Sequence, residues 1–270
     1  MGDNGYRIRR KCYCSAMRSS CFHIHENKKL GGTVTGYRGT ETMDKVLLVI
    51  PAYNEGKNIE RVVDHIKNDF PELDYVVVND GSKDDTAAIC RRRGYNFIDL
   101  PVNLGLAGCF QTGMKYAWQK GYSYAVQFDG DGQHRPEYIK SMKEKMDEGY
   151  DIVIGSRFVT EKKSWSMRML GSRLIGTAIW LTTGAKIKDP TSGMRLFSRK
   201  MIGEFAWNLN YGPEPDTVSF LIRQGAKIAE VQVTIDDRTA GESYLKPLTA
   251  ASYMVRMLLS ILVIQNFRKR

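Results

Sequence analysis

The sequence lacks the features that mark membrane-spanning, disulfide-rich and fibrous proteins. No stretch reaches the roughly 18 uninterrupted apolar residues of a membrane-spanning helix, which excludes a multi-span membrane protein. Only Cys90 and Cys109 lie in the body of the chain, too few for a disulfide framework, so a reducing, cytoplasmic setting fits best. With 42% hydrophobic and 26% charged residues, the 270-residue chain is globular and can bury a large core.

Three common enzyme motifs are also missing. No G-x-G-x-x-G follows the first predicted strand and no G-x-x-x-x-G-K-[ST] occurs anywhere, which disfavours a Rossmann dehydrogenase and a P-loop enzyme. The absence of a G-x-S-x-G elbow makes an α/β-hydrolase an unsuitable interpretation as well. A nucleotide, if this chain binds one, must be held by other means.

The net charge of +10 is unevenly distributed along the chain. Residues 1–42 hold eight Lys and Arg against three Asp and Glu, a surplus of five, and the other 228 residues hold 32 against 27, an equal surplus. The body of the chain is therefore only mildly basic, which suits an anionic ligand or a membrane surface. Because no nucleic-acid-binding motif or basic–aromatic stripe occurs, we expect no nucleic-acid partner.

Residues 1–42 differ in pattern from the rest of the chain. They show no sustained apolar periodicity, carry four glycines between Gly31 and Gly39, and lack the apolar region of a secretory signal. We interpret them as a disordered or non-native N-terminal extension before a start at Met43. The alternative is a zinc site, although the spacing fits no common zinc module. Its ligands would be Cys12, Cys14, Cys21, His23 and His25.

From Lys45 onward, short apolar runs alternate with helical patterns. Strands are predicted over Lys45–Ile50, Tyr75–Val78, Tyr95–Leu100, Tyr124–Phe128 and Ile152–Gly155. Helices are predicted over Glu55–Asp69, Asp84–Arg93, Gly108–Lys120, Pro136–Glu148 and Thr217–Gln224, the last with Asp216 as its N-cap. This alternation predicts an α/β fold with a Rossmann-like, mostly parallel sheet flanked by helices, in one domain over residues 43–247. Ligands of such sheets bind where the carboxyl ends of the strands open into loops.

The segment Asp129-Gly130-Asp131-Gly132-Gln133-His134 follows the fourth predicted strand. Two carboxylates one residue apart can share a hard divalent cation, and Mg²⁺ or Mn²⁺ prefers such oxygen ligands while keeping positions open for phosphate. The glycines allow a sharp turn and leave room for a bulky ligand. We interpret His134 as a neighbour of this loop, since oxygen donors already suffice for the metal.

Polar residues at two other strand ends predict a nucleotide pocket. Asp80, in Asp80-Gly81-Ser82, could accept hydrogen bonds from a base or a ribose, although the same residues also suit an N-capped turn. The segment Pro51–Glu55 offers an aromatic ring and a carboxylate at the same rim, and Asn103 follows the third predicted strand. The sequence therefore places candidate ligand contacts at four strand ends.

Together these residues resemble a known family. Pro51-Ala52-Tyr53-Asn54-Glu55, Asp80-Gly81-Ser82, Asn103-Leu104-Gly105 and Asp129–His134 resemble the inverting family 2 glycosyltransferases of GT-A fold. Within that family, Asp129–Glu137, Gly155-Ser156-Arg157-Phe158 and Asp189-Pro190-Thr191-Ser192-Gly193 resemble the dolichol-phosphate-mannose-synthase-like branch. The resemblance runs from about Val46 to the C-terminus. It implies transfer of a sugar from a nucleotide diphosphate sugar, UDP-glucose or UDP-N-acetylglucosamine, to a polyprenyl phosphate for cell-surface glycan modification.

The resemblance also implies roles for individual residues. Asp129, Asp131 and Gln133 would bind Mg²⁺ or Mn²⁺, and Asp131 would be catalytic through that metal. The nucleotide would contact Pro51, Tyr53, Glu55, Asp80, Asn103 and Asp129. The acceptor phosphate would contact Arg157 and Arg173, and Arg238 with Ser243 would close over the donor diphosphate. Arginine suits both places because its guanidinium presents a bidentate fork to phosphate.

Two acidic residues leave an alternative acceptor open. Glu214 and Asp216 lie where family members that glycosylate hydroxyl groups carry a catalytic base, so either could deprotonate a hydroxyl of a cell-wall or capsular glycan precursor. The Q-x-x-R-W motif of processive polysaccharide synthases is absent, which argues against polymer extrusion.

Two amphipathic segments bear on location. Thr249–Phe267 predicts a helix that lies either in the membrane interface or against the sheet, and we expect residues 248–270 to form a C-terminal amphipathic element. Lys162–Thr183 is a second amphipathic stretch, whose basic residues suit anionic headgroups. We expect a protein on the cytoplasmic face of the cell membrane, and the resemblance suggests a small integral-membrane partner.

Overall fold

The computed structural model describes residues 24–25, 45–161, 163, 166–236 and 247–267. Its strands are β1 (Ile24–His25), β2 (Val46–Ala52), β3 (Asp74–Asn79), β4 (Phe97–Asp99), β5 (Tyr124–Gln127), β6 (Ile152–Ser156), β7 (Arg195–Ser198) and β8 (Ile228–Gln232). They form one sheet in the order β1-β4-β3-β2-β5-β7-β6-β8. Parallel pairing joins β4, β3, β2 and β5, and also β6 and β8, whereas β7 is antiparallel to both of its neighbours. The mostly parallel sheet predicted from the sequence is confirmed.

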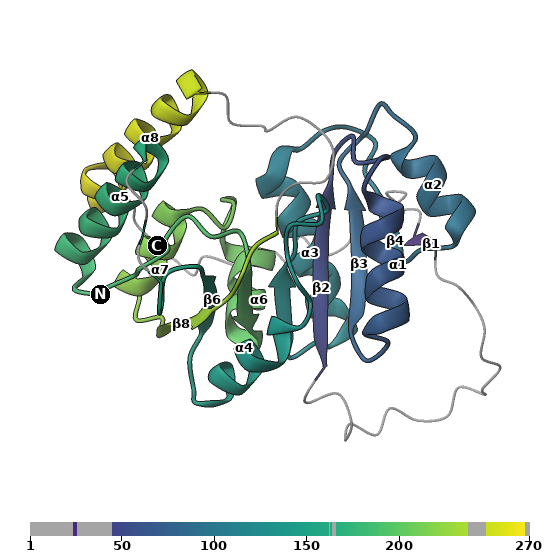
Figure 1. The fold of residues 1–270 in the computed structure, drawn as a ribbon, viewed down its shortest axis with the longest axis horizontal. Helices are drawn as coiled ribbons and strands as arrows, with labels where there is room; N and C mark the ends of the chain where they lie inside the picture. The colour runs from purple at the N-terminus through teal and green to yellow at the C-terminus, as the bar shows by residue number, and fades with distance from the viewer. Residues whose placement is uncertain (1–23, 26–44, 162, 164–165, 237–246, 268–270) are drawn as a thin grey trace, which may run out of the picture.

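Helices cover both faces of this sheet (Figure 1). They are α1 (Ile59–Asp69), α2 (Thr86–Arg93), α3 (Gly105–Lys120), α4 (Tyr138–Asp147), α5 (Met167–Thr183), α6 (Arg199–Gly203), α7 (Pro215–Arg223) and α8 (Pro247–Leu262), with a π-helical turn at Glu204–Asn208 and a 3₁₀ turn at Ile264–Asn266. One core lies between the sheet and α3, α5, α6, α7 and α8, and the other between the sheet and α1, α2 and α4. No helix among the described residues is both long enough and apolar enough to cross a bilayer.

The period of two along each strand sends alternate side chains into the two cores. In β2, Leu47 and Val49 enter the core under α3, while Leu48 and Ile50 enter the core under α1. All four side chains are fully buried. Strands that are buried on both faces have a continuous run of apolar residues in the sequence, which explains why the sequence pattern locates them.

Several predicted bounds differ from the observed ones. The first helix begins at Ile59 rather than Glu55. The carbonyl oxygen of Glu55 accepts the N–H groups of both Asn58 and Ile59, in the turn that leads into the helix. The prediction that Asp216 caps α7 is wrong: Glu214 holds the N-cap position, and Asp216 lies within the first turn. Pro215 at the first helical position moves the start upstream, since its fixed backbone angle suits that place.

Two features of the fold have no counterpart in the sequence predictions. The strands β7 and β8 were not expected, and β7 supplies the antiparallel strand between β5 and β6. Within the segment interpreted as an extension, Ile24 and His25 pair with Ile98 and Phe97 of β4. Of the zinc ligands considered for that segment, only His25 lies within the described residues.

Candidate active site

The loop that follows β5 lies against the carboxyl end of β2. Phe128 donates its N–H to the carbonyl oxygen of Val49, and a side chain at Gly130 would come within 3.1 Å of the Pro51 carbonyl oxygen. The same added carbon would lie 3.8 Å from Cγ of Glu55. The sheet therefore brings the Asp129–Gln133 loop together with Pro51 and Glu55, as the sequence predicts for parallel strand ends.

Asp129 lies between His134 and Gly193. Its N–H donates to Nδ1 of His134 at 2.9 Å, and its Oδ2 lies 3.5 Å from Nε2 of the same ring. Because Nδ1 accepts, the neutral ring carries its proton on Nε2 and has no lone pair left there for a metal. A carbon added to Gly193 would lie 2.8 Å from Oδ2 of Asp129, so only glycine allows this approach. The geometry agrees with the interpretation of His134 as a neighbour of the loop.

Asp131 and Gln133 are held in the same loop by short contacts. Oδ1 of Asp131 accepts the N–H of Gln133 at 3.0 Å, and the Asp131 side chain is buried. The Gln133 amide donates to the carbonyl oxygen of Asp236 at 3.1 Å, which leaves its oxygen as the atom able to bind a metal. Asp236 forms a bidentate ion pair with Arg135, and this guanidinium lowers the pKa of the Asp236 carboxyl.

This donor set fits an open divalent-metal site. Among the described residues no group of three or more His, Cys, Asp and Glu side chains is spaced to enclose one metal ion. Two carboxylates and an amide oxygen on one short loop instead match the pattern of Mg²⁺, which is commonly bound by one or two carboxylates together with substrate phosphates and water. Asp129, Asp131 and Gln133 are the residues that would hold Mg²⁺ or Mn²⁺.

Asp80 holds the loop that contains Asn103. Its Oδ1 accepts the N–H of Leu104 at 2.7 Å, and burial raises the pKa of this carboxyl despite the opposing backbone hydrogen bonds. Gly81 has a φ of +64°, and a side chain there would meet the backbone nitrogen of Asn103 at 2.8 Å. The structure thus places Asp80 and Asn103 together at the carboxyl ends of β3 and β4, next to the start of α3.

The loop carrying Tyr53 and Glu55 is fixed by the neighbouring Ser82–Thr86 loop. Asn54 adopts a left-handed φ of 56°, its N–H donates to the Ser82 hydroxyl, and its own side chain accepts the N–H of Lys83. Glu55 donates its N–H to the Thr86 hydroxyl at 2.9 Å. The Tyr53 ring is left 39% exposed at this rim, where a planar base could stack on it.

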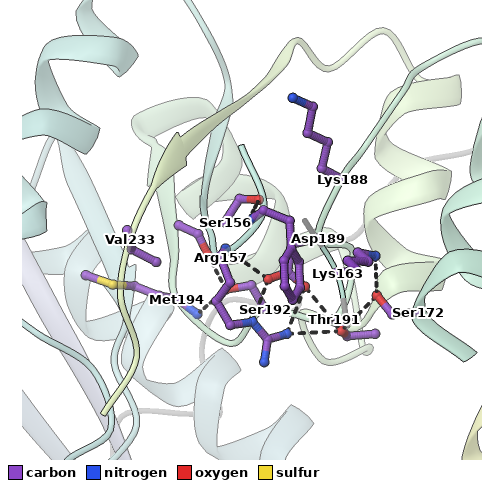
Figure 2. A network of polar contacts seen from close by, with 12 residues as sticks. Ser156, Arg157, Lys163, Ser172, Lys188, Asp189, Thr191, Ser192, Met194 and Val233 are labelled. Carbon is purple, nitrogen blue, oxygen red and sulfur yellow. Dashed lines mark hydrogen bonds and ion pairs between the residues drawn. The ribbon is translucent and has the colours of Figure 1, made fainter. Parts of the chain in front are cut away.

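Arg157 forms a bidentate ion pair with Asp189 (Figure 2). Its Nε and Nη2 donate to the two carboxylate oxygens at 2.7 and 2.9 Å, and its backbone N–H reaches Oδ2 at 3.2 Å. Burial alone would raise the pKa of the fully buried Asp189, but the Arg157 charge and hydrogen bonds outweigh it and lower that pKa. The guanidinium is therefore held rigidly at the end of β6, with a fifth of its side-chain surface exposed.

Arg173 belongs to the same group of polar side chains as Arg157 and Asp189. Its Nη2 donates to the carbonyl oxygen of Lys163 at 2.9 Å, and Nζ of Lys163 donates to the Ser172 hydroxyl at 2.8 Å. Burial lowers the pKa of the Lys163 ammonium. The Ser172 hydroxyl also lies 3.4 Å from that of Thr191, which links α5 to the Asp189–Gly193 loop. The structure thus brings Arg157 and Arg173 into one basic, hydroxyl-rich cluster, as Figure 2 shows for its Arg157 side.

Glu214 and Asp216 contact α8. The Tyr253 hydroxyl donates to Oε2 of Glu214, and the Ser260 hydroxyl donates to Oδ2 of Asp216 at 2.6 Å. Arg238 and Ser243 lie outside the described residues. Asp189 lies in a motif of the resemblance but was given no role of its own, because its partner Arg157 is 32 positions away. Asp236 was not predicted either, because its partner Arg135 is 101 positions away. No sequence motif marks Arg195.

Comparison with known proteins places this chain in a family. The family described as Glycosyl transferase family 2 matches residues 47–205. The polyprenol monophosphomannose synthase of Mycolicibacterium smegmatis is 28% identical over 74% of this chain and 80% of its own length. The UDP-N-acetylglucosamine–dolichyl-phosphate N-acetylglucosaminyltransferase of Methanococcus voltae is 32% identical over 59% of this chain and 72% of its own length.

The fold is also found among solved structures. Glucosyl-3-phosphoglycerate synthase from Mycobacterium tuberculosis, in complex with Mn²⁺, uridine diphosphate and phosphoglyceric acid, superposes with a TM-score of 0.61 at 20% identity. The match covers 84% of this chain and 80% of that one. The predicted GT-A fold is confirmed by this likeness.

Proposed function

Because the chain belongs to glycosyltransferase family 2, we propose that it transfers a sugar from a nucleotide diphosphate sugar to a polyprenyl phosphate. The observation that carries this proposal is the contact between two loops. Asp129 of the predicted metal loop lies against Gly193, and Asp189 of that same second loop holds Arg157. A donor diphosphate on the metal and an acceptor phosphate at Arg157 would thereby be neighbours. The lipid acceptors in the names of the two relatives support the acceptor class.

The donor half of the site comprises the ends of β2, β3, β4 and β5. Pro51, Tyr53, Glu55, Asp80 and Asn103 would surround the nucleotide, and Asp129, Asp131 and Gln133 would hold the metal. A bound Mg²⁺ or Mn²⁺ would neutralise the negative charge that develops on the departing nucleotide diphosphate. We also assign donor diphosphate contacts to Arg238 and Ser243. UDP-glucose and UDP-N-acetylglucosamine are the donors we favour.

The acceptor half needs to position a nucleophile rather than to create one. A phosphate monoester is already ionised near neutral pH, so its oxygen can attack the anomeric carbon without losing a proton to a base. Arg157, held by Asp189, and Arg173 would orient that phosphate through charge-assisted hydrogen bonds. Attack from the side opposite the leaving diphosphate would invert the configuration at the anomeric carbon.

An apolar surface on α5 and α8 suits an acceptor that resides in a membrane. The two helices lie side by side at one end of the molecule (Figure 1). Their exposed apolar side chains are Leu170, Leu174, Trp180 and Leu181 of α5 with Val255, Leu259 and Leu262 of α8, followed by Val263, Ile264 and Phe267. Exposed apolar side chains gathered on two neighbouring helices suit contact with a partner or a membrane. We propose peripheral binding to the cytoplasmic face of the cell membrane through this surface.

The alternative acceptor, a glycan hydroxyl group, receives less support. It requires Glu214 or Asp216 to act as a general base, but both carboxylates already accept hydrogen bonds from side chains of α8. In this structure both carboxylates therefore serve to join the start of α7 to α8.

The proposal is tested by incubating the purified protein with bacterial membranes, Mn²⁺ and a panel of labelled nucleotide sugars. We expect one nucleotide sugar to label the lipid extract, and chelation of the metal to abolish labelling. The bond between sugar and lipid phosphate should break in mild acid. Absence of lipid labelling with every donor of the panel would contradict the proposal.

A further inference from the structure

The beginning of α7 is attached to α8 by three hydrogen bonds. The Tyr253 hydroxyl donates to Glu214, the Ser260 hydroxyl donates to the Asp216 carboxylate, and the Gln265 amide donates to the Asp216 carbonyl oxygen. The three donors span thirteen residues of the chain, from the middle of α8 to the 3₁₀ turn after it, whereas all the acceptors lie in one short segment. Residues 214–216 therefore hold the second half of α8 and the turn that follows it.

The outer side of α8 is the apolar surface described above. Val255 and Leu259 point to solvent, while Met257 and Ile261, which alternate with them along the helix, are buried in the core. The helix thus has one side bound to α7 through polar contacts and another side available to a bilayer. The position of residues 214–216 therefore influences the orientation of the apolar side of α8.

A buried arginine connects this junction with the reaction centre. Arg195 of β7 pairs in register with Gln127, two residues before Asp129, and its Nη2 donates to the Pro190 carbonyl oxygen at 2.9 Å. Its side chain is buried, and within the described part of the chain its Nε has no hydrogen-bond partner. Burial lowers the pKa of its guanidinium, and the charge of Glu214 is the largest influence that opposes this. The positive charge of Arg195 therefore acts on Glu214 as well as on Asp189 and Asp129.

Tyr253 is suited to donate to Glu214. Burial raises the pKa of its phenol, and the adjacent Glu214 carboxylate raises it further, so the hydroxyl keeps its proton. The Glu214 carboxylate accepts this hydrogen bond and so joins the start of α7 to α8. The contact is consistent with a structural use of Glu214 rather than a basic one.

We infer that Glu214 and Tyr253 are positioning residues. Their hydrogen bond fixes where the apolar side of α8 lies relative to the loops carrying Asp129 and Arg157. The inference rests on the proposed function, because it takes the polyprenyl phosphate in the bilayer as the substrate. The position of α8 would control how that substrate approaches the site. A lipid phosphate must reach Arg157 at a fixed depth relative to the membrane surface. Loosening α8 would disturb that depth without removing any group that contacts the donor.

The test measures steady-state transfer from the identified nucleotide sugar to undecaprenyl phosphate in phosphatidylglycerol-containing vesicles. For Tyr253→Phe we expect the acceptor KM to rise roughly tenfold, the scale of one hydrogen bond to a charged group, with kcat and the donor KM changed less than about twofold. Glu214→Ala should behave the same way, and the double variant should be no worse than either single variant. Vesicle binding itself should persist in all of them, since the apolar surface is unchanged.

Two further variants separate positioning from other roles. Glu214→Gln keeps an oxygen that can accept from Tyr253, so it should restore the acceptor KM to within about twofold of the unmodified protein; a general base would instead lose roughly 10²–10⁴ in kcat. Tyr150→Phe, a half-buried tyrosine next to α4, serves as the matched hydroxyl deletion and should change nothing. An unchanged acceptor KM in Tyr253→Phe, or a collapse of kcat in Glu214→Gln, would overturn the inference while leaving lipid transfer established. Failure of the unmodified protein to use undecaprenyl phosphate would overturn both proposals.

Discussion

The two halves of the sheet hold their candidate site residues by different means. In the donor half, around β2 to β5, loops are fixed by backbone groups and by close approaches at glycine, as in the bonds from Asn54 to Ser82 and from Leu104 to Asp80. In the acceptor half, around β6 to β8, side chains pair across long stretches of sequence, as Arg157 does with Asp189. The donor half should therefore tolerate loss of a charge without unfolding, whereas the acceptor half depends on its ion pairs for both structure and function.

The largest effect is expected from Asp131→Asn. The amide keeps an oxygen that can accept the N–H of Gln133, so the loop should retain its shape, but the metal loses one of its two carboxylates. We expect transfer to fall by about 10² or more, with the thermal unfolding midpoint nearly unchanged. Asp85→Asn, an exposed carboxylate at the start of α2 with no side-chain capping bond, is the matched control. Near-normal turnover of Asp131→Asn with Mg²⁺ or Mn²⁺ would contradict the metal assignment.

In the acceptor half, by contrast, loss of one carboxylate charge should lower the stability of the fold. Asp189→Asn leaves the partly buried Arg157 guanidinium without its counter-charge, and removal of one partner of a buried pair costs about 3 kcal/mol of unfolding free energy. Asp236→Asn breaks the more exposed pair with Arg135 and should cost about 1 kcal/mol or less. Urea denaturation of the two variants measures both losses, and equal losses of stability would mean that burial of the Arg157–Asp189 pair does not increase its contribution.

Gly193→Ala probes the point where the two halves meet. The added methyl group would overlap Oδ2 of Asp129, whereas the one added in Gly212→Ala finds its nearest atom at 3.5 Å, an ordinary contact. We expect the metal concentration needed for half-maximal activity to rise roughly tenfold in Gly193→Ala, equivalent to about 1.4 kcal/mol, and to stay constant in Gly212→Ala. The same metal requirement in both variants would mean that Gly193 does not govern the position of Asp129.

The smallest effect is a dependence of stability on acidity. The pKa of Asp189 is lowered in the folded protein, so its contribution is fully present above its unfolded pKa, near 3.9, and is lost as pH falls through the lower folded value. The stability difference between the unmodified protein and Asp189→Asn should therefore narrow below about pH 4. Chemical denaturation at a series of pH values measures this, and a difference that stays constant down to pH 3 would argue against the charged pair.

The contrast also explains which parts of the fold and site the sequence predicts. Strands such as β2 are continuous apolar runs, and the metal and nucleotide residues follow directly at the strand ends, so local pattern is sufficient. The strand β7 escapes prediction because it is only four residues long and begins with the charged Arg195, so it contains no apolar run. The partner of Arg157 could not be foreseen either, because thirty-two positions separate it from Asp189. The contacts of Glu214 and Asp216 with α8 could not be foreseen for the same reason, because about forty positions separate each carboxylate from its donor.

The most direct test of the account compares two acceptors that differ in a single group. The purified protein, Mn²⁺ and the labelled nucleotide sugar are supplied with either a polyprenyl phosphate or the polyprenol of the same length, in the same vesicles. We predict that only the phosphate becomes labelled and that mild acid releases the label. Labelling of the polyprenol, or a product whose bond to the sugar survives mild acid, would contradict transfer to a lipid phosphate.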